Sequence, residues 1–167
     1  TSKIPHTLIA IETGAVTGPD EVFKWDGQKR FMDNWNEDQT FADAFKRSTV
    51  WIFQTVTPRI GPAALHDWLQ QFNYGNADVG PAENVTQYWL TGPLAISAEE
   101  QVAFLAHLAR RTLPLSARTY DLAVPVMVAD SGPGWTLYGK TGWKSVEGEP
   151  EIGWFVGWLE QTGGEAP

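Results

Sequence analysis

The sequence predicts an α+β fold in which a helical region packs on an antiparallel sheet. Apolar residues recur at helical spacing in several segments of the first two thirds of the chain, and strand-like runs follow near its end. Of the 167 residues, 43% are hydrophobic and 9 are Trp, which is enough for one sizeable core. Helices followed by strands are typical of an α+β layered domain.

The first helices are predicted from apolar spacing and from their end signals. Residues 4–13 are apolar at helical spacing, and Gly14 follows in the position of a C-cap. Residues 40–54 indicate a buried helix with a break near Ser48, and residues 62–72 indicate an amphipathic helix.

The most clearly marked helix covers residues 97–111. Ser97 and Glu100 have the spacing of a capping box at its start. Two arginines at its end lie favourably in the field of the helix dipole. Its apolar face is expected to consist of Val102, Leu105, Leu108 and Ala109.

Two strands are expected near the end of the chain. Residues 136–141 and 152–160 are strand-like, and the Gly-, Glu- and Pro-rich segment 147–151 predicts the turn of an antiparallel hairpin. Because a sheet of only two strands would be marginally stable, we expect that strands of the sheet are missing at one or both ends of the given sequence.

Composition excludes several classes of function. The net charge of -8 disfavours binding to nucleic acid or to an anionic membrane surface. The absence of cysteine excludes disulfides and thiolate chemistry, and no apolar run is long enough to span a membrane. The three histidines, His6, His66 and His107, lack metal-ligand spacing, so we expect no metal site and assign them structural or solvent-facing positions.

Several short motifs are weak signals when each is taken alone. Lys140-Thr141-Gly142 ends a strand-like run, and a solvated lysine at a strand end is its simplest interpretation. Since alternate residues of a strand face opposite sides, joint use of Lys140 and Thr141 would need a local twist or bulge. Ser48-Thr49-Val50, Tyr74-Gly75-Asn76 and Trp89-Leu90 would by default be a helix segment, a turn and core packing.

The order of these motifs is far more specific than any one of them. Lys3 fits the end of an S-x-x-K motif whose serine would lie one position before Thr1. With S-x-V, Y-G-N, W-L and K-T-G following in order, the chain resembles the class D (oxacillinase-type) serine β-lactamases over essentially its whole length. Further matching stretches are residues 3–5, 12–14, 23–27, 35–36, 87–90, 96–97 and 153–158.

The resemblance implies the penicillin-recognising serine enzyme fold. Residues 1–167 would form a single penicillin-binding/β-lactamase domain. That domain would lack the N-terminal strands, the nucleophilic serine, and the C-terminal strand and helix. Ser2 is a poor substitute nucleophile, because adjacent helical residues do not face one another.

The resemblance also assigns roles to individual residues. Lys3 would be the general base, carbamylated by carbon dioxide in the apolar surroundings of Val50 and Leu90, and Trp89 would hold the carbamate. Ser48 would relay protons toward the leaving lactam nitrogen. The remaining roles fall on the K-T-G strand: Lys140 and Thr141 would bind the substrate carboxylate, and the strand after Gly142 would supply an oxyanion-hole N–H from Trp143.

Two interpretations are open for residues around the mouth of the site. Phe31, Met32 and Trp143 would line it, although ordinary loop packing is an equally good interpretation. No cofactor other than carbon dioxide is expected.

The function implied is hydrolysis of a β-lactam small molecule by a periplasmic or secreted enzyme, which would give antibiotic resistance. An alternative is the β-lactam-sensing domain of a membrane receptor, which is acylated but not turned over. A third is that residues 1–167 alone fold poorly and are inactive. The substrate spectrum and the oligomeric state stay open.

Overall fold

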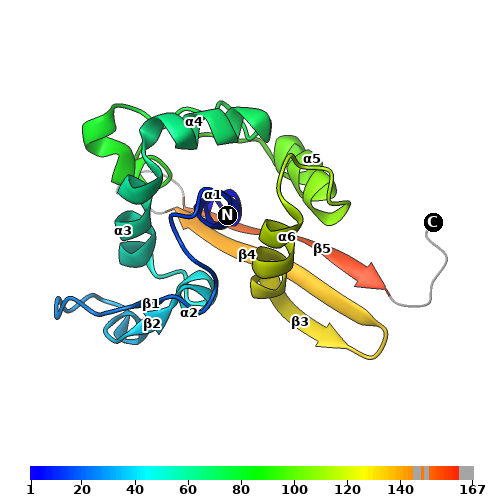
Figure 1. The fold of residues 1–167 in the computed structure, drawn as a ribbon, viewed down its shortest axis with the longest axis horizontal. Helices are drawn as coiled ribbons and strands as arrows, with labels where there is room; N and C mark the ends of the chain where they lie inside the picture. The colour runs from blue at the N-terminus through cyan, green and yellow to red at the C-terminus, as the bar shows by residue number, and fades with distance from the viewer. Residues whose placement is uncertain (145–147, 149–150, 162–167) are drawn as a thin grey trace.

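Helix α1 (Lys3–Glu12) lies at the centre of the molecule, surrounded by other helices, with a sheet along one side (Figure 1). This is seen in a computed structural model that describes residues 1–144, 148 and 151–161. The other helices are α2 (Phe41–Lys46), α3 (Val50–Ile60), α4 (Pro62–Gln71), α5 (Ala98–Ala109) and α6 (Ala117–Ala123), with 3-10 helices η1 (Asp33–Trp35), η2 (Ala82–Gln87) and η3 (Val124–Met127).

The strands form two antiparallel sheets. The larger has the order β3-β4-β5, and the smaller pairs β1 with β2. Their bounds are β1 (Val22–Phe23), β2 (Gln39–Thr40), β3 (Val128–Gly132), β4 (Trp135–Lys144) and β5 (Ile152–Gln161).

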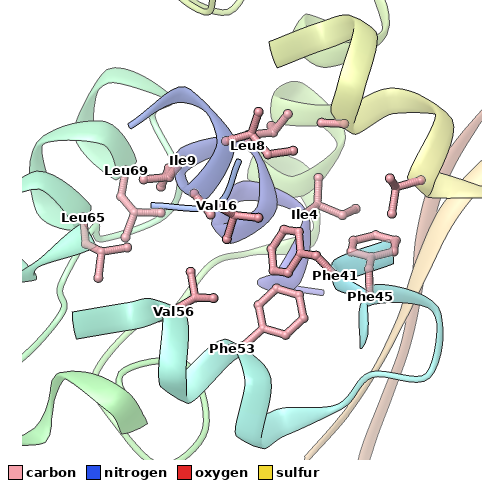
Figure 2. Packing of buried hydrophobic residues seen from close by; sticks show 14 of the residues in the cluster. Ile4, Leu8, Ile9, Val16, Phe41, Phe45, Phe53, Val56, Leu65 and Leu69 are labelled. Atoms are coloured by element: carbon pink, nitrogen blue, oxygen red, sulfur yellow. The ribbon is translucent and has the colours of Figure 1, made fainter. Parts of the chain in front are cut away.

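The core is built around α1, of which every residue from Lys3 to Ile11 is buried. Ile4 faces a layer of phenylalanines from α2 and α3 (Figure 2). Phe41 and Phe53 in this layer lie 5.3 Å apart between ring centroids. Since full burial of one such side chain is worth about 1.5–3 kcal/mol, this helix is fixed mainly by packing.

Strands β4 and β5 pair without a register shift from Trp135↔Gln161 to Lys144↔Ile152. Tyr138 and Trp158 are directly opposite and stack with ring centroids 4.6 Å apart, a cross-strand contact that stabilises this register. The bulge in this sheet lies instead between Val128 and Asp130, on the β3 side. A bulge at the K-T-G triplet is therefore absent.

The predicted elements largely agree with the structure. The break near Ser48 is confirmed, since it separates α2 from α3, but α3 runs six residues beyond the predicted end because Val56 and Thr57 are drawn into the core. The capping box of Ser97 and Glu100 is also confirmed. Of the predicted turn 147–151, only Gly148 and Glu151 are among the described residues.

The predicted face of α5 is partly wrong. Val102 is 68% exposed, and the buried residues are instead Gln101, Phe104, Leu105 and Leu108. Several elements were not predicted: helix α6, which packs against α1, the 3-10 helices, the short β1–β2 pair and strand β3. The β3 sequence VADSG is mostly polar and exposed, so it lacks the apolar alternation that marks a strand.

Candidate active site

The Lys3 side chain is buried at the start of α1. It is 8% exposed, and its Nζ lies 5.2 Å from the centroid of the Phe53 ring. Burial, together with the positive charge of Lys140, lowers the pKa of Lys3 to about 8. A lysine in this state is partly unprotonated near neutral pH and can accept a proton.

Lys140 approaches the same region from strand β4. It is 4% exposed, so the interpretation as a solvated lysine at a strand end is wrong. Its Nζ lies 3.0 Å from Thr141 Oγ1 and 5.7 Å from the Phe45 ring centroid. Burial lowers the pKa of Lys140 to about 8. The amine reaches the neighbouring hydroxyl although the strand pairing is regular, so the two side chains meet without the bulge that was expected.

Trp89 and His6 pack against each other next to Lys3. The two rings lie 5.2 Å apart, and His6 also contacts Phe53 at 5.1 Å, which is the ring beneath Lys3. Burial and the charge of Lys3 lower the pKa of His6 to about 3, so this imidazole is neutral. The Trp89 indole Nε1 is buried and has no hydrogen-bond partner among the described residues.

Ser48 lies at the corner between α2 and α3. Its backbone has φ 58, and its N–H donates to Phe45 O at 3.2 Å. Thr49 is buried and donates to Gln39 Oε1 at 2.7 Å, which fixes the corner. Ser48 therefore lies in the corner between two helices and not within a helix. On one side is Phe45, whose ring contacts Lys140, and on the other is α3, which carries the Phe53 ring near Lys3.

Gly142 lies directly against Thr1. A Cβ on this glycine would lie 2.7 Å from the Thr1 backbone N and 3.0 Å from its Cγ2. A larger residue at this position would therefore collide with the segment that leads into α1. This contact holds the K-T-G strand against the start of the helix that carries Lys3.

The Y-G-N turn clamps the segment that follows Trp89. Asn76 donates to Pro93 O at 2.8 Å and accepts from the Ala95 N–H at 3.0 Å. Gly75 leaves room for this segment, since a Cβ there would lie 2.0 Å from Ala95 O. The motif therefore positions residues 93–95, of which Leu94 and Ala95 line the pocket described next.

A pocket of about 310 Å³ opens between the start of α1, the end of β4 and the clamped segment. The predicted site residues Trp89, Gly142 and Trp143 line it, and Trp143 is 68% exposed. Lys140 and Thr141 do not line this pocket but a separate hollow of about 400 Å³. The full lining of the first pocket is Thr1, Ser2, Tyr74, Trp89, Leu94, Ala95, Ile96, Gly142, Trp143, Lys144, Ile152 and Trp154.

Other predicted residues lie outside this pocket. Val50 begins α3 and packs partly buried against the core, and Leu90 is half-buried in the turn after Trp89. Phe31 is 77% exposed and contacts Trp35, while Met32 is also exposed. Phe31 and Met32 therefore do not line this pocket, and Phe31 instead packs in its own loop.

Comparison with known proteins decides the family. Residues 1–166 match the penicillin-binding protein transpeptidase domain. The chain belongs to this family.

Within the penicillin-binding transpeptidase family, the similar proteins are class D β-lactamases. The chain is 41% identical to β-lactamase OXA-2 of Salmonella typhimurium, over 96% of this chain and 56% of the relative. It is 40% identical to β-lactamase OXA-48 of Klebsiella pneumoniae, over 96% of this chain and 59% of the relative. The chain thus spans just over half the length of these curated relatives.

Solved structures of the family give the same result. The class D β-lactamase YbXI from Nostoc matches with a TM-score of 0.93 and 41% identity, over 96% of this chain and 67% of that one. FUS-1 (OXA-85), a class D β-lactamase from Fusobacterium nucleatum subsp. polymorphum, matches with a TM-score of 0.89 and 36% identity, over 95% and 65%. The fold is therefore the penicillin-recognising serine enzyme fold, and the resemblance to class D is confirmed.

Two residues at this family site were not predicted from sequence. His6 lies three residues after Lys3, and this spacing places both residues on one face of a helix. The spacing could therefore have predicted that His6 lies next to Lys3. Gln101 is a polar residue on the buried face of α5, which it shares with Phe104, Leu105 and Leu108. A polar residue at such a position of the apolar pattern was the signal that could have marked it. Its amide contacts both Thr1 and Tyr74.

Within residues 1–144, 148 and 151–161, no group of His, Asp or Glu could hold a metal ion. No helix in the same part of the chain is both long and apolar enough to cross a membrane.

Proposed function

We propose that the protein containing this chain hydrolyses β-lactam antibiotics through a serine acyl-enzyme and so confers resistance. The observation that carries the proposal is the buried Lys3 amine, whose pKa burial and Lys140 lower to about 8. The similar proteins being β-lactamases supports the same assignment. A buried, partly neutral amine at the start of the central helix is suited to activating a nucleophile.

The nucleophile in this proposal is a serine one position before Thr1. A serine three residues before Lys3 would lie one helical turn away and on the same face. It would attack the lactam carbonyl, and Ser48 would pass a proton to the lactam nitrogen as the C–N bond breaks. The N–H groups of Trp143 and of the serine would stabilise the oxyanion, a contribution that is typically about 100- to 1,000-fold per donor.

The base is proposed to be Lys3 carrying a carbamate. A neutral amine adds carbon dioxide and releases one proton, and the resulting carbamate supplies a base for acylation and for deacylation. The residues present fit this group, because the buried Trp89 Nε1 lacks an acceptor among the described residues. Trp89 would donate its N–H to the carbamate, and His6 would hold the indole in place.

Lys140 and Thr141 are proposed to bind the carboxylate that penicillin-type substrates carry. Neither Lys3 nor Lys140 has an ion-pair partner within the described part of the chain, so an anion between them would be stabilised. We further propose a periplasmic or secreted location, which cell fractionation tests directly.

The deciding experiment is steady-state turnover of a chromogenic cephalosporin by the full-length protein. We expect many turnovers per protein molecule, with activity increased by added bicarbonate. A burst of one equivalent without turnover would instead support the alternative of a β-lactam-sensing receptor domain. The carbamate is tested separately by ¹³C NMR in labelled bicarbonate, where its signal should be absent from Lys3→Ala.

A further inference from the structure

Gln101 on α5 connects two parts of the site. Its Nε2 donates to Thr1 Oγ1 at 2.9 Å and to the Tyr74 hydroxyl at 2.8 Å, and the side chain is 2% exposed. We infer that Gln101 is a positioning residue that fixes Thr1, and with it the start of α1, against the Y-G-N turn. The inference rests on the proposed function, in which the nucleophile directly precedes Thr1.

Thr1 is contacted from two sides. Gln101 of α5 donates to its hydroxyl, and Gly142 of β4 lies against its backbone. The same Gln101 amide also donates to Tyr74, which ties this contact to the Y-G-N turn. A residue placed between the nucleophile and Lys3 controls the geometry of both without taking part in the chemistry. A displacement of about 1 Å at a reacting group can cost about 100-fold in rate.

Stability does not explain the choice of glutamine at this position. Gln101 occupies a buried-face position of α5 together with Phe104, Leu105 and Leu108, where an apolar side chain would pack well. Its Oε1 is buried and has no hydrogen-bond partner in the part of the chain that the structure describes. A half-satisfied buried amide is less favourable for folding than an apolar residue of similar size, so its use here indicates a functional contact.

The inference predicts opposite effects on stability and on chemistry. In the full-length protein, Gln101→Leu should leave the Tm unchanged or higher and should lower the acylation rate constant by about 10- to 100-fold. The dissociation constant of the complex formed before acylation should change little. The matched control is Gln54→Leu, at a half-buried glutamine of α3 whose amide makes only a 3.5 Å contact with Thr86 O. This control should leave acylation unchanged.

The route through Thr1 is tested by a double-mutant cycle. Thr1→Val keeps the shape of the side chain and removes the hydroxyl that accepts from Gln101. If Gln101 acts through Thr1, Gln101→Leu should have little further effect on acylation in the Thr1→Val protein. Fully additive effects would overturn the inference, and so would unchanged acylation in Gln101→Leu. An equal loss in Gln54→Leu would overturn it as well.

A measurement without substrate separates this inference from the proposed function. The Ile4 N–H donates to Thr1 O at 3.0 Å, and the His6 N–H donates to Ser2 O at 3.1 Å, so both amides report the order of the first turn. Hydrogen exchange at these amides should be faster in Gln101→Leu than in the wild type. If β-lactams do not acylate the wild-type protein, the proposed function is wrong. If hydrogen exchange at these two amides is the same in Gln101→Leu and the wild type, the positioning role is wrong, whatever the result of the acylation experiment.

Discussion

Charges around the β1–β2 pair are matched, whereas those at the centre of the site are not. Lys3 and Lys140 are buried together, and neither forms an ion pair within the described residues. Around β1–β2 the structure has the pairs Lys24–Asp38, Arg30–Asp26, Arg47–Glu37 and Arg59–Glu21.

The two regions differ in which groups change their charge near neutral pH. At the surface, the hydrogen bonds that Asp26 accepts, first from Arg30, lower its pKa to about 2, so the carboxylate stays charged at neutral pH. At the centre, burial lowers the pKa of both lysines to about 8, so their charge changes near the working pH. The Asp26 carboxylate therefore keeps its charge at neutral pH, while Lys3 and Lys140 have pKa values at which they can gain or lose a proton.

The largest expected effect is from Lys3→Ala in the full-length protein. Removing the proposed base should lower β-lactam turnover by about 100- to 10,000-fold. The control is Lys24→Ala, which removes an exposed lysine paired with Asp38 and should leave turnover unchanged. Turnover of Lys3→Ala within a few-fold of wild type would show that the unpaired lysine is not the base.

The next effect concerns the indole N–H of Trp89, which has no partner in the part of the chain that the structure describes. Trp89→Phe should lower turnover by about 10- to 100-fold, the range typical for removing a partner of a catalytic group, and bicarbonate should restore part of it. Trp68→Phe, at a half-buried tryptophan of α4, is the matched control and should show neither effect. A Trp89→Phe protein that bicarbonate does not rescue would argue against a carbamate held by this residue.

Gly142→Ala tests the contact between β4 and α1. The new methyl group would lie 2.7 Å from the Thr1 backbone N, so the strand or the helix must shift. We expect a lower Tm and about tenfold lower turnover. Gly153→Ala is the matched control, because it lies on the paired strand opposite Trp143 and a Cβ there meets nothing within 4 Å. Equal behaviour of the two variants would refute the close contact.

These residues also show how far sequence reasoning reaches. Lys3, Trp89 and Lys140 were predicted because motif order is visible in sequence, and the capping residues Ser97 and Glu100 because a capping box is local. Residues whose role depends on contacts between distant segments were missed. Gln101 bonds to Thr1, one hundred positions away, and no local pattern carries that information.

The fold was predictable to a similar degree. Strongly periodic helices and the two long strands follow from their own residues, but strand β3 exists because β4 pairs with it. The length of α3 likewise depends on the core that receives Val56 and Thr57. Tertiary packing decides such elements, and it overrides local preference.

The pH dependence of stability separates the two regions. The pKa of His6 is lowered to about 3 from 6.5, so stability should fall as the pH decreases from about 6.5 toward 3. The lysines are lowered from 10.5 to about 8, so they should raise stability as the pH increases between about 8 and 10.5. Asp26, with a pKa near 2 instead of 3.8, loses its contribution only below about pH 4. Urea unfolding at a series of pH values measures this, and His6→Phe should flatten the profile between pH 3 and 6.5.

The smallest expected effect is at a surface pair. Glu21 accepts from Arg59 at 2.7 Å and from the Thr17 N–H at 2.7 Å. Glu21→Gln should cost less than about 1 kcal/mol of unfolding free energy, because solvent screens such pairs. Turnover should not change. A loss of turnover comparable to that of Trp89→Phe would show that the surface charges are coupled to the site after all.

The left-handed backbone of Ser48 has an evolutionary consequence. With φ 58, this corner suits glycine even better than serine, so Ser48→Gly would preserve the turn between α2 and α3. Under the proposed mechanism, that one replacement would remove the proton relay and keep the scaffold intact. A lineage could therefore drift from catalyst to β-lactam-binding protein at this position without passing through an unfolded intermediate.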